Sequence, residues 1–366
     1  MTIPNPIPFT KVIDALLDES TPFSPKYLNR LSDLDPVDKS LLEDIWSKVS
    51  IRRRNALLED MEEIHMADDL LCFEQVGRVA LKDSDPGLRM RAIQILREYE
   101  LVDLLPIFVE MSEHDPDVDV RAAAAAALAT YIFMGEVEDI SPKRLQLVEA
   151  CLLRLISSKD AMIVRRRALE ALGFSSRMEL VGQIEKAYAS TDMDWLVSAL
   201  FTMGRSANSS WKPQVLSMLT HENPSVRAEA ASAAGELEIK SAVPRLLKLL
   251  RDSDIDVRMA SIWSLSQIGG AGVRSALESL LESTNDDEEA NQIENALENL
   301  GFTDEMNDLS LLDIPEDGDD PDDTLDDGED EEVDADEFNQ RRSEDDDEEE
   351  VDDDYLDELI SEDDED

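Results

Sequence analysis

Side chains that could hold a metal or act as nucleophiles are few in this chain. The sequence has three histidines and two cysteines in 366 residues. The one His-Glu pair is His221-Glu222, and the other two histidines are His65 and His114. A metal site needs several histidine, cysteine or carboxylate ligands that converge from separate elements. The sequence therefore predicts no metal, no cofactor and no catalytic residue.

The cysteines and glycines also favour structural roles. Cys72 and Cys151 lie far apart in apolar helical contexts, which predicts buried free thiols and a reducing compartment. The segment 269–272, Gly-Gly-Ala-Gly, follows an expected helix and lacks the Lys-Ser/Thr of a phosphate-binding loop, so we expect a turn. The N-terminus shows no secretory signal, and no stretch is long and apolar enough to span a bilayer. We expect a cytoplasmic protein that does not enter membranes.

The elements that would position any site repeat along the chain. Positions in each copy are counted from offset zero, the residue named at the end of this paragraph. The residue at offset 4 is small in all six copies, and offsets 0, 4, 5 and 8 share one face of a helix. A small residue in the middle of that face predicts a close crossing by another helix. The last four copies are 31 residues apart, and a longer link near 136–143 separates the second copy from the third. Offset zero of the copies is Leu88, Val120, Val164, Trp195, Val226 and Val257.

Each copy begins with the signature of a helix start. An Asp or Asn three residues before offset zero acts as an N-cap in five copies, followed by Pro in two of them. An apolar-periodic run precedes most of these starts, so each copy is expected to be a hairpin of two helices with no strand. The preceding helices are expected at 144–157, 179–190, 213–220, 242–250 and 272–281.

A 31-residue helical hairpin with an Asp/Asn cap, a Val-Arg pair and a small residue resembles the HEAT repeat. The similarity is to the short bacterial type that also occurs in phycobilisome lyases and deoxyhypusine hydroxylase, and it is clearest at 160–174, 222–238 and 252–270. The resemblance implies an all-α fold, an α-solenoid of antiparallel helix pairs with armadillo-type architecture. The expected domains are an N-terminal helical cap at 1–50, a solenoid at 51–302 with clear repeats from about 81 to 302, and a disordered acidic tail at 303–366.

The resemblance also implies a structural role for the recurrent acids and arginines. In HEAT repeats the cap residue and the arginine after it form a ladder of hydrogen bonds between successive loops. Trp195-Leu196 replaces Val-Arg in one copy, so the ladder is expected to break there. The expected ladder residues are Asp85, Arg89, Asp117, Arg121, Arg165, Asn223, Arg227, Asp254 and Arg258.

Four arginines exceed what the ladder needs. We place Ile51-Arg52 in the anchor role of a divergent repeat, which leaves Arg53 and Arg54 as surplus, as Arg166 and Arg167 are in a later repeat. One hypothesis is a groove for an acidic ligand. The alternative is a solvated flank that balances nearby acids.

The charge of the chain is unevenly distributed. It has 86 acids and 34 bases, a formal net charge of −52, and 36 of those acids lie in residues 303–366 beside two bases. A field this negative excludes direct binding of nucleic acid or an anionic membrane by the whole chain and favours basic proteins as partners of the tail. Such partners fit both ordinary chaperoning and nucleic-acid mimicry.

The tail contains one apolar stripe of helical spacing. These residues occupy relative offsets 0, 4, 5, 8 and 9, so they could form a segment that folds on a partner. The alternative is a solubilising tail in which the apolar residues have no partner. The stripe consists of Val351, Tyr355, Leu356, Leu359 and Ile360.

Two classes of function are compatible with these patterns. The first is a non-enzymatic protein–protein interaction scaffold or adaptor, in which the tail serves basic partners or gates the solenoid surface. The second is a phycobilin lyase-like or deoxyhypusine hydroxylase-like enzyme or enzyme subunit, as the resemblance implies. The His-Glu metal pairs of the hydroxylase are absent from the matching positions. We therefore expect the scaffold and no enzymatic activity.

Overall fold

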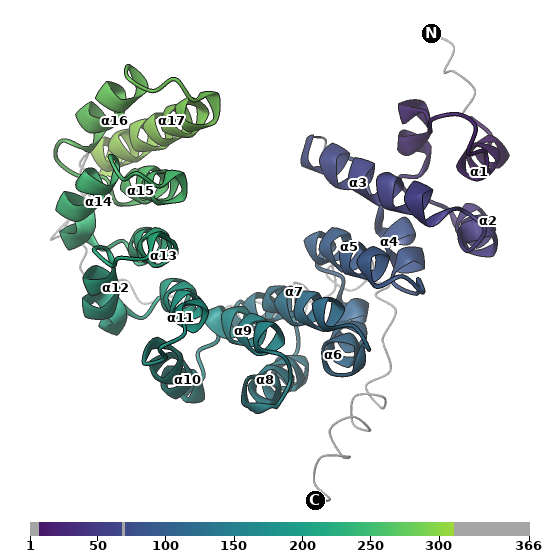
Figure 1. Cartoon of the computed structure of the whole chain (residues 1–366), viewed down its shortest axis with the longest axis horizontal. Helices are drawn as coiled ribbons and strands as arrows, with labels where there is room; N and C mark the ends of the chain where they lie inside the picture. The colour runs from purple at the N-terminus through teal and green to yellow at the C-terminus, as the bar shows by residue number, and fades with distance from the viewer. Residues whose placement is uncertain (1–6, 68–69, 311–366) are drawn as a thin grey trace, which may run out of the picture. The chain divides into compact units, whose positions relative to one another are not determined.

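The computed structural model describes residues 7–67 and 70–310, with the side chains of 65–67 and 302–310 left out (Figure 1). The chain divides into two units, 1–298 and 299–366. Within the described residues the secondary structure is entirely helical. The description below concerns residues 7–298, and residues 299–310 form the end of the last helix.

The N-terminal helices lead into the repeats without a separate core. Phe9, Val12 and Leu16 of the first helix are buried. Asp35 caps the second α-helix by accepting hydrogen bonds from the backbone N–H groups of Val37 and Asp38. These elements are α1 (Phe9–Leu17), η1 (Pro25–Arg30), α2 (Pro36–Trp46) and α3 (Ile51–Ala67).

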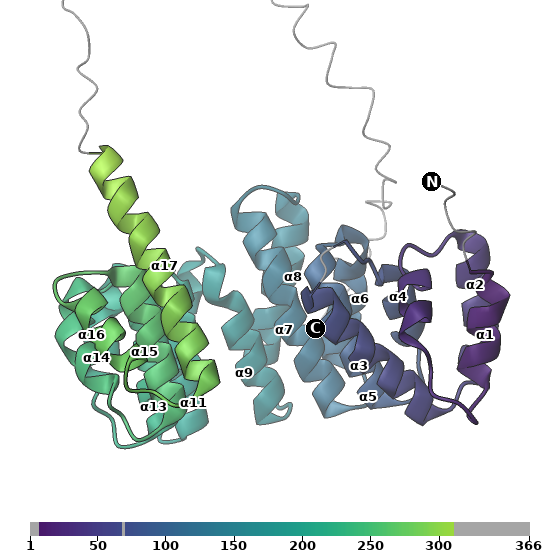
Figure 2. The same cartoon turned by 90° about the horizontal axis from the view of Figure 1, so that it is seen from above.

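Seven helix pairs follow α3 in the described chain, and Figure 2 shows the helices of successive pairs side by side. The first helices are α4 (Glu74–Ala80), α6 (Leu105–His114), α8 (Pro142–Ser157), α10 (Met178–Tyr188), α12 (Lys212–Met218), α14 (Val243–Leu249) and α16 (Val273–Leu281). The second helices are α5 (Pro86–Leu96), α7 (Val118–Glu136), α9 (Met162–Ala171), α11 (Met193–Arg205), α13 (Pro224–Glu236), α15 (Ile255–Ile268) and α17 (Asp287–Ser310). Short 3₁₀ turns are η2 (Arg97–Tyr99), η3 (Val102–Leu104), η4 (Leu172–Phe174), η5 (Ser209–Trp211) and η6 (Lys240–Ala242).

The second helices start where the sequence places their N-caps. In each capped copy the side-chain oxygen accepts from a backbone N–H two or three residues ahead, which satisfies a donor that has no partner inside the helix. Ala161 makes no such bond, and the preceding Asp160 accepts from the Ala161 backbone instead. The capping residues are Asp85, Asp117, Asp192, Asn223 and Asp254.

The second helices pack against one another in a row. Their small residue at offset 4 is fully buried in all six copies, so a neighbouring helix lies close at this point. In Figure 1 this row forms the inner side of the curved stack within residues 7–298, and the first helices form the outer side. The six buried residues are Ala92, Ala124, Ala168, Ala199, Ala230 and Ser261.

Glycines mark the closest contacts within the row. Gly173, Gly204 and Gly235 are 31 residues apart and occupy offset 9 of consecutive copies. A Cβ at Gly204 would lie 3.1 Å from the Cα of Ala233, and one at Gly235 would lie 2.9 Å from the Cα of Ser264. These contacts involve the backbone of the next helix, so a side chain there would push α11 from α13, or α13 from α15.

The long central repeat is lengthened in its helices. α7 has 19 residues and α8 has 16, whereas the link between them spans only 137–141. From the sequence we expect the extra residues of this repeat to form a longer link near 136–143. They instead lengthen α7 and α8, because the apolar periodicity of these helices continues. Among the described helices α7 alone has the length and apolarity of a possible membrane span, and half of that stretch is buried inside the protein. A core helix accounts for this.

Candidate functional site

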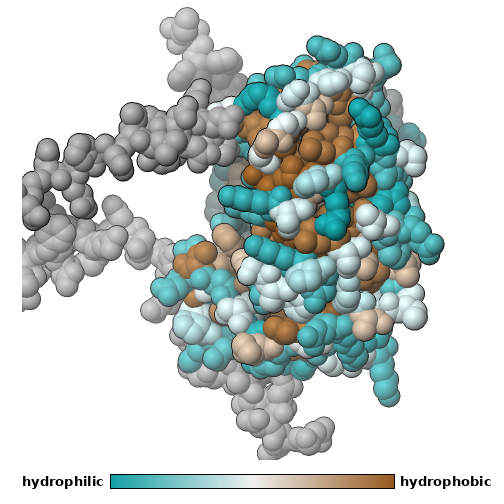
Figure 3. Space-filling view, turned by 90° about the vertical axis from the view of Figure 1, so that its left-hand side faces the viewer, coloured by the Kyte–Doolittle hydropathy of each residue, from teal (hydrophilic) through white to brown (hydrophobic). Residues whose placement is uncertain are grey.

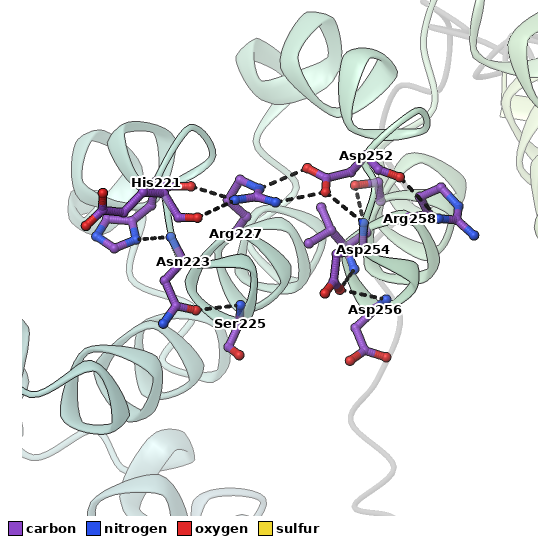
Figure 4. Close-up of polar contacts among 11 residues, drawn as sticks. His221, Asn223, Ser225, Arg227, Asp252, Asp254, Asp256 and Arg258 are labelled. Atoms are coloured by element: carbon purple, nitrogen blue, oxygen red, sulfur yellow. Dashed lines mark hydrogen bonds and ion pairs between the residues drawn. The ribbon is translucent and has the colours of Figure 1, made fainter.

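Arginines at offset 1 connect successive repeats through paired hydrogen bonds. Arg89 donates two bonds of 2.8 and 2.9 Å to the carboxylate of Asp115 in the next loop. Arg121 does the same to Asp160, and Arg227 does so to Asp252. The Arg227 guanidinium also donates to the carbonyls of the loop that precedes its own helix (Figure 4). Each such arginine therefore joins two loops.

The acid of each pair differs from the expected one. The sequence pairs the arginines with the cap residues, but Asp117 and Asp254 accept from backbone N–H groups of their own helices. The arginine partner comes two residues before the cap, as Asp115 and Asp252 do, and its carboxylate also accepts from the backbone N–H of the cap residue. Figure 4 shows this arrangement around Asp252 and Asp254. The assignment of the cap residues to the ladder is wrong, because their side chains bond to their own helices and the acid two residues earlier meets the arginine.

The remaining expected ladder residues lie at the ends of the pattern or at its break. Arg258 donates to Glu289 in the first turn of α17 at 2.6 Å. Among the described residues no carboxylate pairs with Arg165; it donates to the carbonyl of Ile156, and its guanidinium lies 5.4 Å from the centre of the Trp195 ring. Leu196, where an arginine would continue the ladder, is buried. A cation–π contact therefore stands where the other repeats have an ion pair.

Arg54 and Arg53 hold the N-terminal repeat together. Arg54 is buried against the carboxylate of Asp83, which also accepts from the indole Nε1 of Trp46 at 2.7 Å. Arg54 thus occupies the ladder position four residues after a cap, Ser50, so the prediction that it is surplus is wrong by a shift of two residues in register. Arg53 donates to the carbonyls of Asp18 and Thr21 and borders a cleft of about 540 Å³ beside α3.

Arg166 and Arg167 are also engaged by neighbouring acids. Arg166 makes an ion pair of 2.7 Å with Asp194 and donates to Ser198. Arg167 pairs with Glu170 at 2.6 Å and is half exposed. Both arginines therefore have acidic partners within the protein, as the alternative of a flank that balances nearby acids expects, and the groove for an acidic ligand stays a prediction. The expected tail contacts, Val351, Tyr355, Leu356, Leu359 and Ile360, lie outside the described residues.

A second stripe on the same helices was not singled out from the sequence. Successive helical residues are turned by about 100°, so offsets 3, 6 and 10 lie opposite the buried offsets 0, 4, 5 and 8. These residues face away from the paired first helices, on the inner side of the stack. We call them the inner stripe. From α7 to α15 it comprises Ala123, Ala126, Thr130, Arg167, Glu170, Phe174, Ser198, Phe201, Arg205, Glu229, Ser232, Glu236, Ala260, Trp263 and Gln267.

Aromatic residues and one arginine form the middle of the inner stripe. Phe133, one turn beyond Thr130, is 46% exposed, and its ring meets the Phe174 ring edge-on at 5.4 Å. The Arg205 guanidinium lies 5.0 Å from the centre of the Phe174 ring and 4.5 Å from that of Phe201. Arginine and aromatic side chains of this kind dominate the binding energy of protein interfaces. Three consecutive repeats thus present one continuous aromatic surface.

The next helix contributes carboxylates to the same stripe. Glu236 lies over Gly204, because a Cβ there would be 2.5 Å from the Glu236 Oε2 atom. Glu229 is half-buried, and burial followed by repulsion from Glu236 and Glu170 raises its pKa to about 7, against the opposing effect of Arg205. Within the described residues, part of the negative charge of Glu229 and Glu236 at neutral pH therefore has no paired cation.

The raised pKa of Glu229 predicts that E229Q increases the free energy of unfolding, and that the increase depends on pH. A folded pKa near 7, above the ordinary 4.5, means that ionisation disfavours folding increasingly as the pH rises from about 4.5 to 7. E229Q removes this cost, so its free energy of unfolding should exceed that of the wild type by about 1–2 kcal/mol at pH 8, after allowance for solvent screening, and by less at pH 5. Denaturant titration at both pH values measures this, with E185Q on exposed α10 as the control. A difference independent of pH would contradict it.

The outer face of the C-terminal repeats is a weaker candidate for a binding site than the inner stripe. Figure 3 views the molecule from the side of α14 and α16 and shows apolar residues in furrows between polar ridges. In α12, α14 and α16 no large apolar side chain among the described residues is exposed. The described residues also contain no group of three or more His, Cys, Asp or Glu side chains placed to hold a metal. The inner stripe is therefore the best candidate site.

The stacked helix pairs define the class of the protein, an all-α solenoid. Its repeats are HEAT-like: a family model of HEAT repeats matches residues 74–129 and 212–298. No curated protein matches the sequence.

Solved structures of similar architecture include three helical-repeat proteins. The complex of CpcE and CpcF of phycocyanin lyase from Nostoc sp. PCC7120 is 19% identical, covers 62% of this chain and 94% of that chain, and has a TM-score of 0.43. Human deoxyhypusine hydroxylase is 18% identical, covers 71% of this chain and 95% of that chain, and has a TM-score of 0.32. A designed armadillo repeat protein is 16% identical, covers 54% of this chain and 99% of that chain, and has a TM-score of 0.32.

Proposed function

We propose that this protein is a non-enzymatic scaffold or adaptor that binds a protein partner on the inner stripe of its second helices. The observation that carries the proposal is the aromatic surface of Phe133, Phe174 and Phe201 around Arg205, which lies on the inner side of the array. Stacked repeats commonly use such extended surfaces for binding. The remaining polar groups of the stripe would form the rim of the interface.

We assign the acidic tail at 303–366 to basic protein partners. Gating of the solenoid by the tail would need free cations at the predicted arginine clusters. Arg54 and Arg166 are instead paired with acids, and Arg53 is bonded to backbone carbonyls. The two free cysteines fit a reducing, cytoplasmic location. Burial raises the pKa of the Cys151 thiol to about 12 and that of the Cys72 thiol above its usual value. Such thiols are poor nucleophiles.

A steric block on the inner stripe should remove the partner. Ser232 lies between Glu229 and Glu236 on one helix face, so S232R places a long cation over the stripe. Affinity capture from the source cells with the full chain should recover a partner that S232R loses by tenfold or more. The matched change S275R, on the exposed outer side of α16, should retain it. Equal recovery by both variants would contradict the proposal.

An enzyme of the lyase or hydroxylase type is the competing function. Metal analysis and an absorbance scan of the purified full chain separate the two. The scaffold predicts neither stoichiometric iron nor a bound chromophore. Either finding would overturn the proposal that the protein is not an enzyme.

A further inference from the structure

The acidic part of the inner stripe lies between aromatic residues of two neighbouring helices. α13 presents Glu229 and Glu236, while α11 on one side presents Phe201 and α15 on the other presents Trp263. The Trp263 ring reaches α13, because a Cβ at Gly235 would lie 2.7 Å from its Cζ3 atom. Glu236 reaches the opposite way, over Gly204 of α11. The two carboxylates therefore lie on a surface between Phe201 and Trp263.

These carboxylates lack the partners that the other acids of the row have. Glu170 accepts hydrogen bonds of 2.6 Å from Ser198 and from Arg167. Within the described residues Glu229 and Glu236 have no hydrogen bond or ion pair of this kind, and the nearest cation, Arg205, is stacked on two phenylalanine rings. Two like charges on one face without a bound cation repel each other. A cation supplied by a partner would relieve this repulsion.

We propose that α13 binds a cationic side chain, arginine or lysine, of a partner protein, with Glu229 and Glu236 as its counter-charges and Phe201 and Trp263 beside it. The inference rests on the proposed function and names the chemistry of the partner. Carboxylates supply charge-assisted hydrogen bonds, and the Trp263 ring adds cation–π attraction, since the Phe201 ring already stacks on Arg205. The partner segment also places an apolar side chain against Phe133 and Phe174.

The spacing of the helices sets the distance between the two contacts of the partner, which are the apolar contact at Phe174 and the cation-binding site on α13. We call these contacts the anchors. Phe174 follows α9, and α13 lies two second helices further along the row. Adjacent helix axes are about 8–10 Å apart, so the anchors are separated by about 16–20 Å. An extended chain advances about 3.3 Å per residue, which places the apolar anchor and the basic residue about five or six residues apart. The partner motif is therefore short and extended.

Binding should strengthen with pH in a defined range. The groups that face Glu229 are Glu236 on its own helix, Glu170 on α9 and Arg205 on α11. Because the pKa of free Glu229 is raised to about 7, a bound cation favours its ionised form and lowers that pKa. Affinity should therefore rise as the pH increases through about 7 and level off above it.

The test uses the full chain and a labelled glycine-serine peptide that carries one phenylalanine and, about six residues further on, three arginines. At about 0.15 M salt, which screens distant charges, fluorescence anisotropy should show that E229Q/E236Q weakens binding about tenfold. The control E185Q/E278Q removes the same charge from exposed positions on α10 and α16 and keeps the tail, so it should change affinity less than twofold. A peptide with citrulline in place of arginine should lose binding to the wild type.

Two results would overturn the inference. One is an equal loss of affinity in E229Q/E236Q and E185Q/E278Q, which would mean diffuse attraction to the acidic chain. The other is no binding of the arginine peptide by the wild type, or equal binding of the citrulline peptide. Neither result affects the capture test with S232R, which reports on the inner stripe as an interface whatever the charge of the partner.

Discussion

D83A is expected to lower the free energy of unfolding of the N-terminal repeats by about 3–5 kcal/mol. The Asp83 side chain is fully buried, and it accepts hydrogen bonds from Arg54, from the Trp46 indole and from the backbone N–H of Asp85. Its removal leaves the Arg54 charge buried without a counter-charge, which is the costly way to break an ion pair. Denaturant unfolding followed by circular dichroism measures the loss.

D103A is the matched control for this effect. Asp103 accepts two bonds from one arginine, Arg78, at 2.6 and 2.8 Å, but its side chain is 45% exposed. Water can replace an exposed carboxylate, so its loss should cost less than about 1 kcal/mol. Equal losses in D83A and D103A would show that the Arg54–Asp83 pair does not hold α3 to the repeats.

G235A is expected to destabilise the solenoid by about 1–3 kcal/mol, although alanine favours helices over glycine. Its Cβ would lie 2.7 Å from the Oγ atom of Ser264 and 2.9 Å from the Ser264 Cα atom. α13 and α15 would have to separate, which also weakens the hydrogen bond of 2.7 Å from Ser264 to the carbonyl of Ala231. The same denaturation measurement applies.

G182A distinguishes a packing effect from a change in helix propensity. Gly182 lies in α10 with no atom within 4 Å of a Cβ placed there. Alanine should therefore stabilise this helix by about 0.5–1 kcal/mol. If G235A stabilises the protein as G182A does, the close contact between α13 and α15 is contradicted.

The sequence was sufficient to predict the architecture of the repeats. The 31-residue period, the cap at Asp117 or Asp254 and the small residue at offset 4 each reflect a local rule of helix formation or packing. The cap is a rule of one helix, whereas the period and the recurrent small residue emerge when the copies are compared, and the sequence alone supplies both. The HEAT-like solenoid follows from their repetition.

The partners of the arginines could not be predicted in the same way. The acid that each arginine meets belongs to the next repeat, and the choice between Asp252 and Asp254 depends on how two loops stack. A signal was present, since Asp83, Asp115 and Asp252 all occupy the position five residues before offset zero. Offset rules alone do not say which of the two acids faces the arginine of the preceding repeat. At Arg54 the missing Asp or Asn cap shifted the expected register by two residues.

The positions of the inner stripe could have been predicted from the helical period, but its residue types gave no signal. Its members differ from copy to copy, as Glu170, Phe201 and Trp263 do at offset 6, so they form no repeated motif. Only the stacking of α9, α11, α13 and α15 places Phe174 beside Arg205 and Glu236 beside Gly204. Variable residues on an invariant frame are what a specific binding surface requires.

Site-specific photo-crosslinking in the source cells tests most directly whether the inner stripe is the binding surface. A photoreactive residue at Thr130 or Ser232 lies on the inner stripe, and one at Glu185 or Ser275 lies on the exposed outer helices. The inner positions should give the same crosslinked protein, and the outer positions should give none. A partner that crosslinks from Glu185 or Ser275, and not from Thr130 or Ser232, would contradict the account.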